Sequence, residues 1–309
     1  MPLCIFKCGK AHRRWKNISN HTRGRIRLTS PTESPTPQAK VQNRELEKLP
    51  IVELTQPPYL KGVPRILLVH GTMDRAASFR RMARHLEQYQ VISYDRRGYG
   101  DSKALNPDGT QMKLSWQIHL ADLMDIISQE PTVVFGHSYG GTLSLLAAER
   151  HCTNLLGLVT FESPFPWVEK WAKWPHYSLD PSKDIDPEWA GLEVANFMIE
   201  MIGESTWKRL PAGVKEKRIS EGITMVSEIS SLAHLDPVLD PAKIDIPLLV
   251  ARSELAPIRH KEISDYLIAN VTGAWFEIVP DTGHGIHLQR PERAAELIKE
   301  LIIKSGLGE

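Results

Sequence analysis

Short apolar runs alternate with amphipathic segments along most of the chain, and this alternation limits the possible folds more than any other feature. Each run is four to six residues long, is rich in Val, Leu, Ile or Phe, and ends at turn residues. Runs of this kind are typical of strands that are buried on both faces of a parallel sheet. They are Arg65–Val69, Val91–Tyr94, Thr132–Phe135, Leu156–Phe161, Pro247–Ala251 and Ala274–Val279.

Helix-like segments fill the spaces between the apolar runs. Ser115 and Pro291 stand at the start of two of them, and both residue types are favoured at the first positions of helices. Strand-like runs that alternate with such segments predict an α/β fold with a doubly wound, mostly parallel sheet. The expected helices lie near 76–88, 115–129, 139–151, 258–270 and 291–304.

One long interruption breaks this alternation. The 85 residues between Phe161 and Pro247 contain no clear strand, and parts of them look helical. A structureless loop of that length is uncommon inside a compact domain, so we expect a helical cap at 166–239, inserted into a core of 46–165 and 240–309. The interruption is rich in tryptophan, and we expect this cap to supply apolar walls of a binding site. The tryptophans are Trp167, Trp171, Trp174, Trp189 and Trp207.

The first 45 residues differ from the rest of the chain in composition. Residues 1–29 hold eight Lys or Arg and no Asp or Glu, and residues 30–37 form a linker rich in Pro, Ser and Thr. Because such a linker favours extended, poorly packed chain, we expect 1–45 to be a disordered tail. A basic start without acidic residues also fits a transit peptide, whereas the apolar stretch of a secretory signal is missing.

The overall composition excludes several classes of protein. Hydrophobic residues make up 41% and charged residues 24%, as in ordinary globular chains, and the formal net charge is +1. So small a charge gives no field that would attract nucleic acid or an acidic membrane surface. No run of about 18 apolar residues occurs, so no membrane-spanning helix is expected. We therefore expect a small-molecule substrate, with neither nucleic acid nor a membrane as partner, and leave the oligomeric state open.

The three cysteines do not form a disulfide framework. Cys4 and Cys8 lie in the tail and Cys152 follows an expected helix, so we expect free thiols in a reducing compartment. The expected location is the cytoplasm, with import into an organelle through the basic N-terminus as the alternative. Cys4, Cys8 and His12 could bind a metal, but no fourth ligand lies nearby and free thiols are the simpler interpretation. We expect no metal and no cofactor.

A serine stands between an expected strand and an expected helix in the segment Gly136-His137-Ser138-Tyr139-Gly140. The pattern G-x-S-x-G carries meaning in this strand–turn–helix context. The turn is so sharp that Gly136 and Gly140 must lack a β-carbon. It exposes the hydroxyl at the helix N-terminus, where backbone N–H groups favour negative charge. We interpret Ser138 as a nucleophile, and the alternative is a plain turn with a capping serine.

The loop after the strand at 65–69 begins with His-Gly. Attack of a serine on a carbonyl creates an oxyanion, which two N–H donors must stabilise. One donor is expected from the backbone of Tyr139, the residue after the nucleophile. The other is expected from Thr72 or Met73 in this earlier loop. A His-Gly pair alone also fits an ordinary turn, but its place ahead of the serine motif favours the oxyanion loop.

His284 is the expected general base. It follows Gly283 in a loop after the last expected strand. A serine hydroxyl is a poor nucleophile until a nearby imidazole takes its proton. His284 is the one late histidine that directly follows a glycine, and its place after the serine fits the chain order of such sites. His287 is the alternative, because most of the chain's 12 histidines are expected to be structural.

The imidazole needs a carboxylate that fixes its tautomer and stabilises its charged form. Two candidates lie between the serine and the histidine in the chain. Glu162 directly ends one expected strand, and Glu254 follows another by three residues. We favour Glu162, because it comes off a rigid strand end and the prolines among residues 163–166 restrict the backbone after it. Glu254 is the alternative acid.

Four segments of the sequence together resemble the α/β-hydrolase superfamily. They are VHGT (69–72), YDRRGYGDS (94–102), GHSYGG (136–141) and DTGHG (281–285). In combination they are specific for the superfamily, over roughly residues 60–305, but not for a substrate. The resemblance implies an α/β-hydrolase fold and makes Asp95–Ser102 a structural loop near the site.

The sequence departs from the commonest pattern of that superfamily at the acid. Most relatives carry an Asp after the penultimate core strand, and Ala256 occupies that place here. A subset that includes zearalenone lactonase instead has a Glu 24 residues after the serine, which is the separation of Ser138 and Glu162. The resemblance thus supports Glu162 and suggests an ester or lactone substrate. Dehalogenases and epoxide hydrolases of this fold carry Asp at the nucleophile position, so a serine points to acyl transfer to water.

These residues predict a cofactor-free serine hydrolase that cleaves a small to medium, partly hydrophobic carboxylic ester or lactone through an acyl-enzyme. The same residues would serve a hydrolase of C–C bonds or thioesters, or a proline iminopeptidase. An alternative of another class is a receptor on this fold that binds a ligand without turnover. The presence of Ser138, His284 and a suitable acid favours an enzyme.

Overall fold

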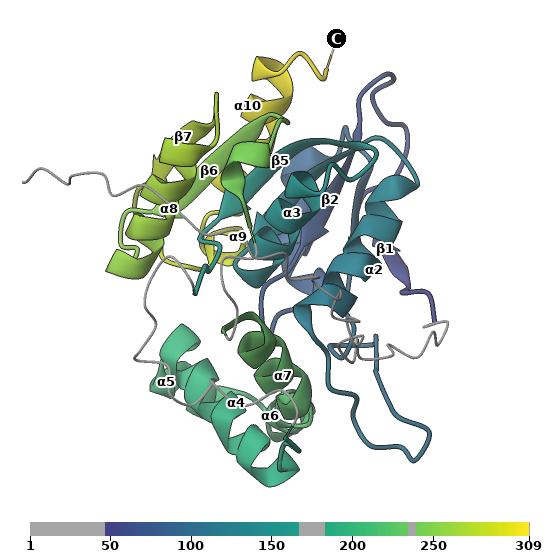
Figure 1. Cartoon of the computed structure of the whole chain (residues 1–309), viewed down its shortest axis with the longest axis vertical. Coiled ribbons are helices and arrows are strands. Elements are labelled where there is room, and N and C mark those ends of the chain that lie inside the picture. The colour runs from purple at the N-terminus through teal and green to yellow at the C-terminus, as the bar shows by residue number, and fades with distance from the viewer. Residues whose placement is uncertain (1–46, 167–182, 234–238, 309) are drawn as a thin grey trace, which may run out of the picture. The chain divides into compact units, whose positions relative to one another are not determined.

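One sheet of seven strands forms the centre of the computed structural model, which describes residues 47–166, 183–233 and 239–308. The strands are β1 (Ile51–Glu53), β2 (Arg65–Val69), β3 (Val91–Tyr94), β4 (Thr132–His137), β5 (Leu155–Phe161), β6 (Leu248–Ser253) and β7 (Trp275–Val279). Their order in the sheet is β1-β3-β2-β4-β5-β6-β7 (Figure 1). The strand β1 is antiparallel to β3, and every other neighbouring pair is parallel.

The six predicted apolar runs each form a strand, so the predicted mostly parallel sheet is present. The strand β1 was not predicted, because it has only three residues and all of them are exposed. It therefore lacks the nearly continuous burial of the strands from β2 to β6, whereas β7 was predicted although some of its side chains are exposed too.

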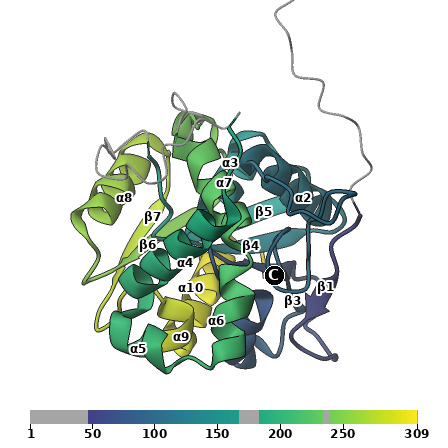
Figure 2. The same ribbon diagram turned by 90° about the horizontal axis from the view of Figure 1, so that it is seen from below.

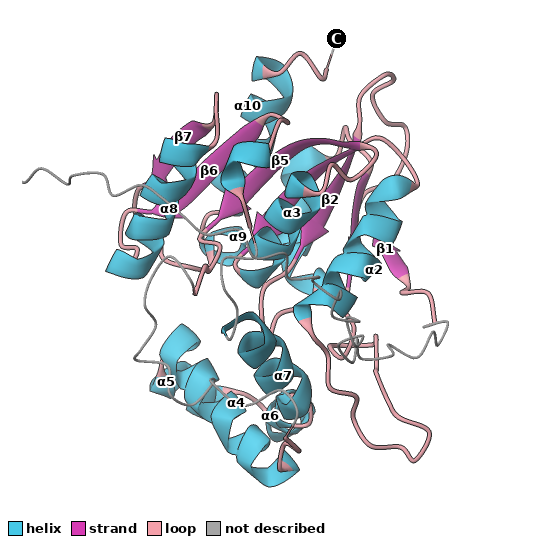
Figure 3. Ribbon diagram, viewed as in Figure 1, coloured by secondary structure: helices cyan, strands magenta, loops and turns pink. Residues whose placement is uncertain are grey.

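Helices cover both faces of this sheet (Figure 3). In the core they are α1 (Arg80–Ala83), α2 (Trp116–Ser128), α3 (Tyr139–Glu149), α8 (Ile258–Asn270), α9 (Ile286–Gln289) and α10 (Pro291–Lys304). The helix predicted near 76–88 is present over 76–86, but it is irregular. That segment forms two 3-10 turns, Ala76–Phe79 and Arg84–Leu86, on either side of the four-residue α1. The N–H of Ala76 at its start donates a 2.8 Å hydrogen bond to the carboxylate of Asp95.

Alternate side chains of the central strands enter two separate cores. Ile66 and Leu68 of β2 belong to the core that α1 and α10 cover, whereas Leu67 and Val69 belong to the one that α2, α3 and α8 cover. Successive residues of a strand point to opposite faces, so both sets must be apolar. Full burial of one such side chain contributes about 1.5–3 kcal/mol relative to exposure. This two-sided burial explains the unbroken apolar runs in the sequence.

Four further helices lie between β5 and β6 in the chain, and we call them the inserted helices. They are α4 (Pro187–Ile202), α5 (Glu204–Arg209), α6 (Ala212–Ile219) and α7 (Gly222–Ala233). Figure 1 shows them grouped below the sheet, beyond one end of its strands, and Figure 2 shows them from below, in front of the sheet. The carboxylate of Asp186 caps α4 by accepting a 2.7 Å hydrogen bond from the N–H of Trp189, and Gly203 with φ of 83° ends that helix.

The inserted helices have an apolar core of their own. Phe197 of α4 and Met225 and Val226 of α7 pack in it together with Met73 and Tyr99 from loops after strands of the sheet. Parts of the predicted cap, residues 167–182 and 234–238, lie outside the described residues, as does the predicted tail. Within the described residues, no helix combines the length and apolar character needed to cross a bilayer.

Candidate active site

Ser138 stands at the bend between β4, which ends at His137, and α3, which begins at Tyr139. Its φ of 52° and ψ of −126° place a residue with a β-carbon in a sparsely populated conformation. The N–H of Ser138 donates a 2.9 Å hydrogen bond to the carbonyl of Phe161 at the end of β5. The neighbouring strand thus holds the strained bend, and the serine is presented at the helix N-terminus.

The glycines around Ser138 make this bend possible, because backbone atoms of neighbouring elements lie where their side chains would be. A β-carbon at Gly136 would lie 2.5 Å from the Cα of Gly141, and one at Gly140 would lie 2.4 Å from the carbonyl oxygen of Val69. Real β-carbons do not approach other atoms so closely. The start of α3 can therefore pack against β4 only if Gly136 lacks a side chain, and against the end of β2 only if Gly140 does.

Glu162 and His284 lie together, although 122 residues separate them in the chain. The Nδ1 of His284 is 2.6 Å from Oε2 of Glu162, whose residue is only 3% exposed. Oε1 of Glu162 accepts hydrogen bonds from the N–H and the hydroxyl of Ser253, at 2.9 and 2.5 Å. Glu254, the alternative acid, is exposed, and its backbone N–H bonds to the carbonyl of Val279. The structure thus brings Glu162, and not Glu254, to the imidazole.

The carboxylate of Glu162 is held in its charged form. Burial opposes that charge, but the hydrogen bond and charge of His284, the charge of His260 and the bond from Ser253 outweigh burial and lower the pKa of Glu162 to about 2. An ionised carboxylate accepts from Nδ1–H of His284, which leaves the other ring nitrogen as an acceptor. This is the tautomer that a general base needs.

His284 comes from the loop after β7, and Ser138 and His284 line the same cavity. Within the described ranges, no hydrogen bond joins the Ser138 hydroxyl to the His284 ring. Such bonds are often long in ligand-free enzymes and shorten when substrate binds. The carbonyl of His284 accepts a 2.8 Å hydrogen bond from Nε2 of His137, which fixes the loop against the end of β4.

The cavity contains about 540 Å³ of empty space, part of it open to solvent. Its apolar walls come from α4 and α7 and from the prolines that follow Glu162. The inserted segment thus supplies apolar walls, as expected, although its Trp189 and Trp207 pack within the inserted helices and do not line the cavity. Trp167, Trp171 and Trp174 lie outside the described residues. The lining residues are Thr72, Ser138, Tyr139, Pro164, Pro166, Phe197, Met201, Ile229, Leu232, Arg259, His260 and His284.

Two of the three predicted oxyanion residues reach this cavity. Thr72 and Tyr139 line it beside Ser138, whereas Met73 is buried in the core of the inserted helices. Among the described residues, none accepts a hydrogen bond from the backbone N–H of Thr72 or of Tyr139. Both donors are therefore available to a charge that develops near Ser138.

His287, the alternative base, does not line the cavity. It is 2% exposed on α9, with Nε2 3.0 Å from Oδ2 of Asp74, and its ring packs on Phe79. Burial opposes the charge of Asp74, but the bond and charge of His287 outweigh it and hold the pKa of that carboxyl well below its usual range. This pair joins the loop after β2 to α9.

Two groups in the described part of the chain have side chains of the kinds that bind metals. One is Glu162 with His260 and His284, and the other is Asp74 with His137 and His287. In each group the ligand-type atoms lie within 4.8 Å of one another. Each carboxylate already has protein partners: Glu162 binds His284 and Ser253, and Asp74 binds His287. Cys4, Cys8 and His12, the possible ligands in the tail, lie outside the described residues.

Two contributors to the site were not predicted from the sequence, Ser253 and His260. Ser253 ends β6 directly before Glu254, but nothing in its surroundings shows that its hydroxyl faces Glu162. The ring of His260 on α8 stacks on that of His284, with centroids 5.3 Å apart. Burial, aided by the charges of His284 and Arg259, lowers the pKa of His260 to about 3 against the opposing charge of Glu162, so this ring is neutral at neutral pH.

Known proteins share this architecture. The α/β-hydrolase fold family matches residues 64–291. The chain belongs to the α/β-hydrolase family. This match confirms the predicted fold and the prediction of a hydrolase.

Individual relatives of this α/β-hydrolase include lipase LipV from Mycobacterium tuberculosis, which is 27% identical over 77% of this chain and 93% of LipV. Epoxide hydrolase 4 from Mus musculus is 31% identical over 35% of this chain and 30% of its own length. Among solved structures, MenH from S. aureus superimposes with a TM-score of 0.64 at 17% identity, over 84% of this chain and 99% of MenH. At that identity the superposition shows the fold alone.

Proposed function

We propose that this α/β-hydrolase is a serine hydrolase of carboxylic esters and lactones, with Ser138 as nucleophile, His284 as base and Glu162 as acid. One observation carries the proposal: Ser138 and a histidine paired with a buried, ionised carboxylate line the same cavity. Nucleophile, base and the group that orients the base are the parts that acyl transfer needs.

The reaction begins when His284 takes the proton of Ser138 and the serine oxygen attacks the carbonyl carbon. The N–H groups of Thr72 and Tyr139 stabilise the oxyanion, and Glu162 stabilises the imidazolium. The alcohol leaves with the proton from His284, which then activates water to hydrolyse the acyl-enzyme. Loss of one oxyanion donor typically costs about 2.7–4 kcal/mol of transition-state stabilisation.

The cavity supports a substrate of small to medium size. Most of its walls are apolar, as is usual in sites for small ligands. We propose that the inserted helices act as a cap over Ser138, because Phe197 and Met201 of α4 and Ile229 and Leu232 of α7 form these walls. A cap of this kind favours a compact, partly hydrophobic substrate over a protein chain.

The choice of an ester or lactone has two supports. The name of LipV is that of a lipase, and lipases cleave esters. The acid follows β5, as in the subset of the superfamily that includes a lactonase. Hydrolysis of C–C bonds or thioesters and removal of N-terminal proline stay as alternatives on the same residues, as does a receptor without turnover. The cytoplasmic location and the lack of nucleic-acid and membrane partners stay predictions.

A substrate panel tests the proposal. Purified full-length protein is assayed with p-nitrophenyl butyrate, an aliphatic lactone, an acyl thioester and proline p-nitroanilide, alongside Ser138→Ala and, as a control, Ser128→Ala on the exposed end of α2. We expect turnover of the ester and the lactone, a loss on the order of 10⁴-fold or more in Ser138→Ala, and none in Ser128→Ala. Equal turnover by Ser138→Ala, or turnover of only the thioester or the proline substrate, would contradict the proposal.

A further inference from the structure

A buried ion pair joins the inserted helices to the sheet. Arg96, in the loop after β3, binds Glu228 of α7 through two bonds, Nη1 to Oε2 at 2.6 Å and Nη2 to Oε1 at 3.1 Å. Their side chains are 1% and 0% exposed. Charges so far from water need several polar partners to be tolerated, so the other contacts of Glu228 show what the pair does.

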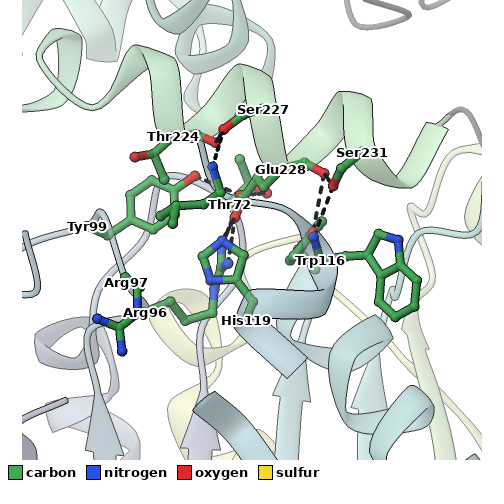
Figure 4. A network of polar contacts seen from close by, with 12 residues as sticks. Thr72, Arg96, Arg97, Tyr99, Trp116, His119, Thr224, Ser227, Glu228 and Ser231 are labelled. Atoms are coloured by element: carbon green, nitrogen blue, oxygen red, sulfur yellow. Dashed lines mark hydrogen bonds and ion pairs between the residues drawn. The ribbon is translucent and has the colours of Figure 1, made fainter. Parts of the chain in front are cut away.

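Glu228 also binds the loop that supplies an oxyanion donor. Its Oε1 accepts hydrogen bonds of 2.7 Å from the hydroxyl of Thr72 and of 2.7 Å from that of Tyr99 (Figure 4). On the other side of the loop, the guanidinium of Arg96 donates to the carbonyls of His70 and Gly71, at 3.0 and 3.1 Å. Both members of the ion pair thus bind the loop that carries the N–H of Thr72: Arg96 binds its backbone, and Glu228 binds the side chain of Thr72.

The second oxyanion residue contacts the same pair. The guanidinium carbon of Arg96 lies 4.8 Å from the centre of the Tyr139 ring. The hydroxyl of Tyr139 donates a 3.2 Å hydrogen bond to the backbone carbonyl of Glu228. Both residues proposed to stabilise the oxyanion are therefore fixed, through their side chains, to one charged pair that bridges sheet and inserted helices.

We propose that Glu228 is a positioning residue for the oxyanion hole, acting through Thr72 and Arg96. Donors that are already in place stabilise a developing charge without a cost of reorganisation. A shift of about 1 Å in such a site can lower the rate 100-fold. Ile229, directly after Glu228, and Leu232, about one turn further along α7, line the cavity. The same helix therefore contacts the substrate and holds the donors, so its placement sets both binding and rate.

The inference rests on the proposed function, since without an acyl-transfer reaction there is no oxyanion to stabilise. The competing interpretation is that Glu228 acts only as a structural brace, which keeps α7 packed on the core. A brace affects folding stability, whereas a positioning residue affects the transition state more than the bound substrate. Kinetic constants and the affinity of a transition-state analogue separate the two.

The main experiment uses Thr72→Val, which keeps the shape and the backbone N–H but removes the hydroxyl that Glu228 holds. Thr72→Ser restores that hydroxyl. Thr55→Val is the matched control, because Thr55 is buried and its hydroxyl bonds Tyr89 and Val91 at 2.8 and 2.9 Å, at the opposite end of the strands. For each full-length variant, kcat and KM for p-nitrophenyl butyrate, inhibition by a trifluoromethyl ketone and the thermal midpoint are measured.

We expect Thr72→Val to lower kcat about tenfold or more, to leave KM within about twofold, and to weaken the trifluoromethyl ketone, which forms an oxyanion adduct with serine, by a similar factor. Thr72→Ser should recover most of both losses. Thr55→Val should lower the thermal midpoint without changing kcat. Glu228→Gln with Thr72→Val should lower kcat less than the product of the two single effects, because both act through one contact.

Two outcomes would overturn the inference. If Ser138-dependent turnover exists and Thr72→Val behaves like Thr55→Val, the positioning role is wrong and the proposed function stands. If wild-type protein shows no turnover that depends on Ser138, the proposed function fails and the positioning role fails with it. Where Glu228→Gln does not fold, the Thr72 series alone decides between these outcomes.

Discussion

At the scale of single residues, the surroundings of two glutamates decide between them. Glu162 and Glu254 both follow strands of the sheet and both lie between the serine and the histidine in the chain. Only Glu162 is buried and lies 2.6 Å from the Nδ1 of His284. A carboxylate that is exposed to water and makes no contact with the ring can neither fix its tautomer nor stabilise its charge.

The first prediction concerns these two glutamates. Glu162→Gln keeps the shape of the side chain but presents the wrong group to His284, so kcat for an ester should fall on the order of 10⁴-fold. Glu254→Gln should leave kcat within about twofold, because this exposed side chain does not contact His284 and surface substitutions seldom alter the fold's stability by more than about 0.5 kcal/mol. The measurement is steady-state kinetics of both variants, with circular dichroism to show that each is folded. A larger loss in Glu254→Gln than in Glu162→Gln would reverse the assignment of the acid.

How far the sequence predicts these residues depends on how local the signal is. Ser138 and His284 could be named because each lies in a short motif that follows a strand, and Glu162 because it ends one. Glu228 could not be named, since its partners Thr72 and Arg96 lie 156 and 132 residues away in the chain. The contact forms only in the folded chain, so no local sequence pattern in the helix predicts it.

At the scale of elements, two-sided burial made most of the strands predictable, and the G-x-S-x-G motif made the bend at Ser138, which we call the elbow, predictable. The antiparallel β1 was missed because its side chains are exposed, and the helix predicted near 76–88 is irregular, with 3-10 turns at both ends. The elbow is fixed by backbone rather than by side chains. At Gly140 the start of α3 packs against the end of β2, with no room for a β-carbon.

The second prediction concerns this packing. Gly140→Ala places a β-carbon 2.4 Å from the carbonyl oxygen of Val69, so α3 or β2 must shift. We expect the free energy of unfolding to fall by at least about 1–3 kcal/mol, together with a loss of turnover as Ser138 moves. Gly213→Ala on α6 is the matched control, because nothing lies within 4 Å of the added carbon.

The control substitution should be neutral or should stabilise α6 by about 0.5–1 kcal/mol, since alanine is favoured over glycine inside helices. Urea denaturation and ester kinetics of both variants check the pair. Equal stability and equal turnover of Gly140→Ala and Gly213→Ala would show that the elbow tolerates a side chain, against the geometry described above.

At the scale of the whole molecule, buried histidines couple folding to pH. Burial, with the charge of Arg96, lowers the pKa of His70 to about 4, and burial lowers that of His260 to about 3. In the unfolded chain both have pKa values near about 6.5. Below that pH the unfolded state binds protons that the folded state excludes. The stability these rings contribute is therefore complete above about pH 6.5 and is lost as the pH falls toward 4 and 3.

The third prediction follows from this linkage. The free energy of unfolding should fall between pH 6.5 and pH 4, with a slope of up to about 1.4 kcal/mol per pH unit for each such histidine. His260→Gln should flatten the slope, because one titrating ring is removed. Urea denaturation at pH 7, 6, 5 and 4 measures both profiles. A wild-type profile that is flat over this range, or a slope that His260→Gln leaves unchanged, would contradict the assignment.

The central claim, that Ser138 is a nucleophile activated by His284, is tested most directly by covalent labelling of the full-length protein with a fluorophosphonate. Intact mass spectrometry should show one adduct per chain, and peptide mapping should place it on Ser138. The adduct should be absent from Ser138→Ala and should form much more slowly in His284→Ala. A protein that takes up no label, or that is labelled equally in Ser138→Ala, would contradict the claim.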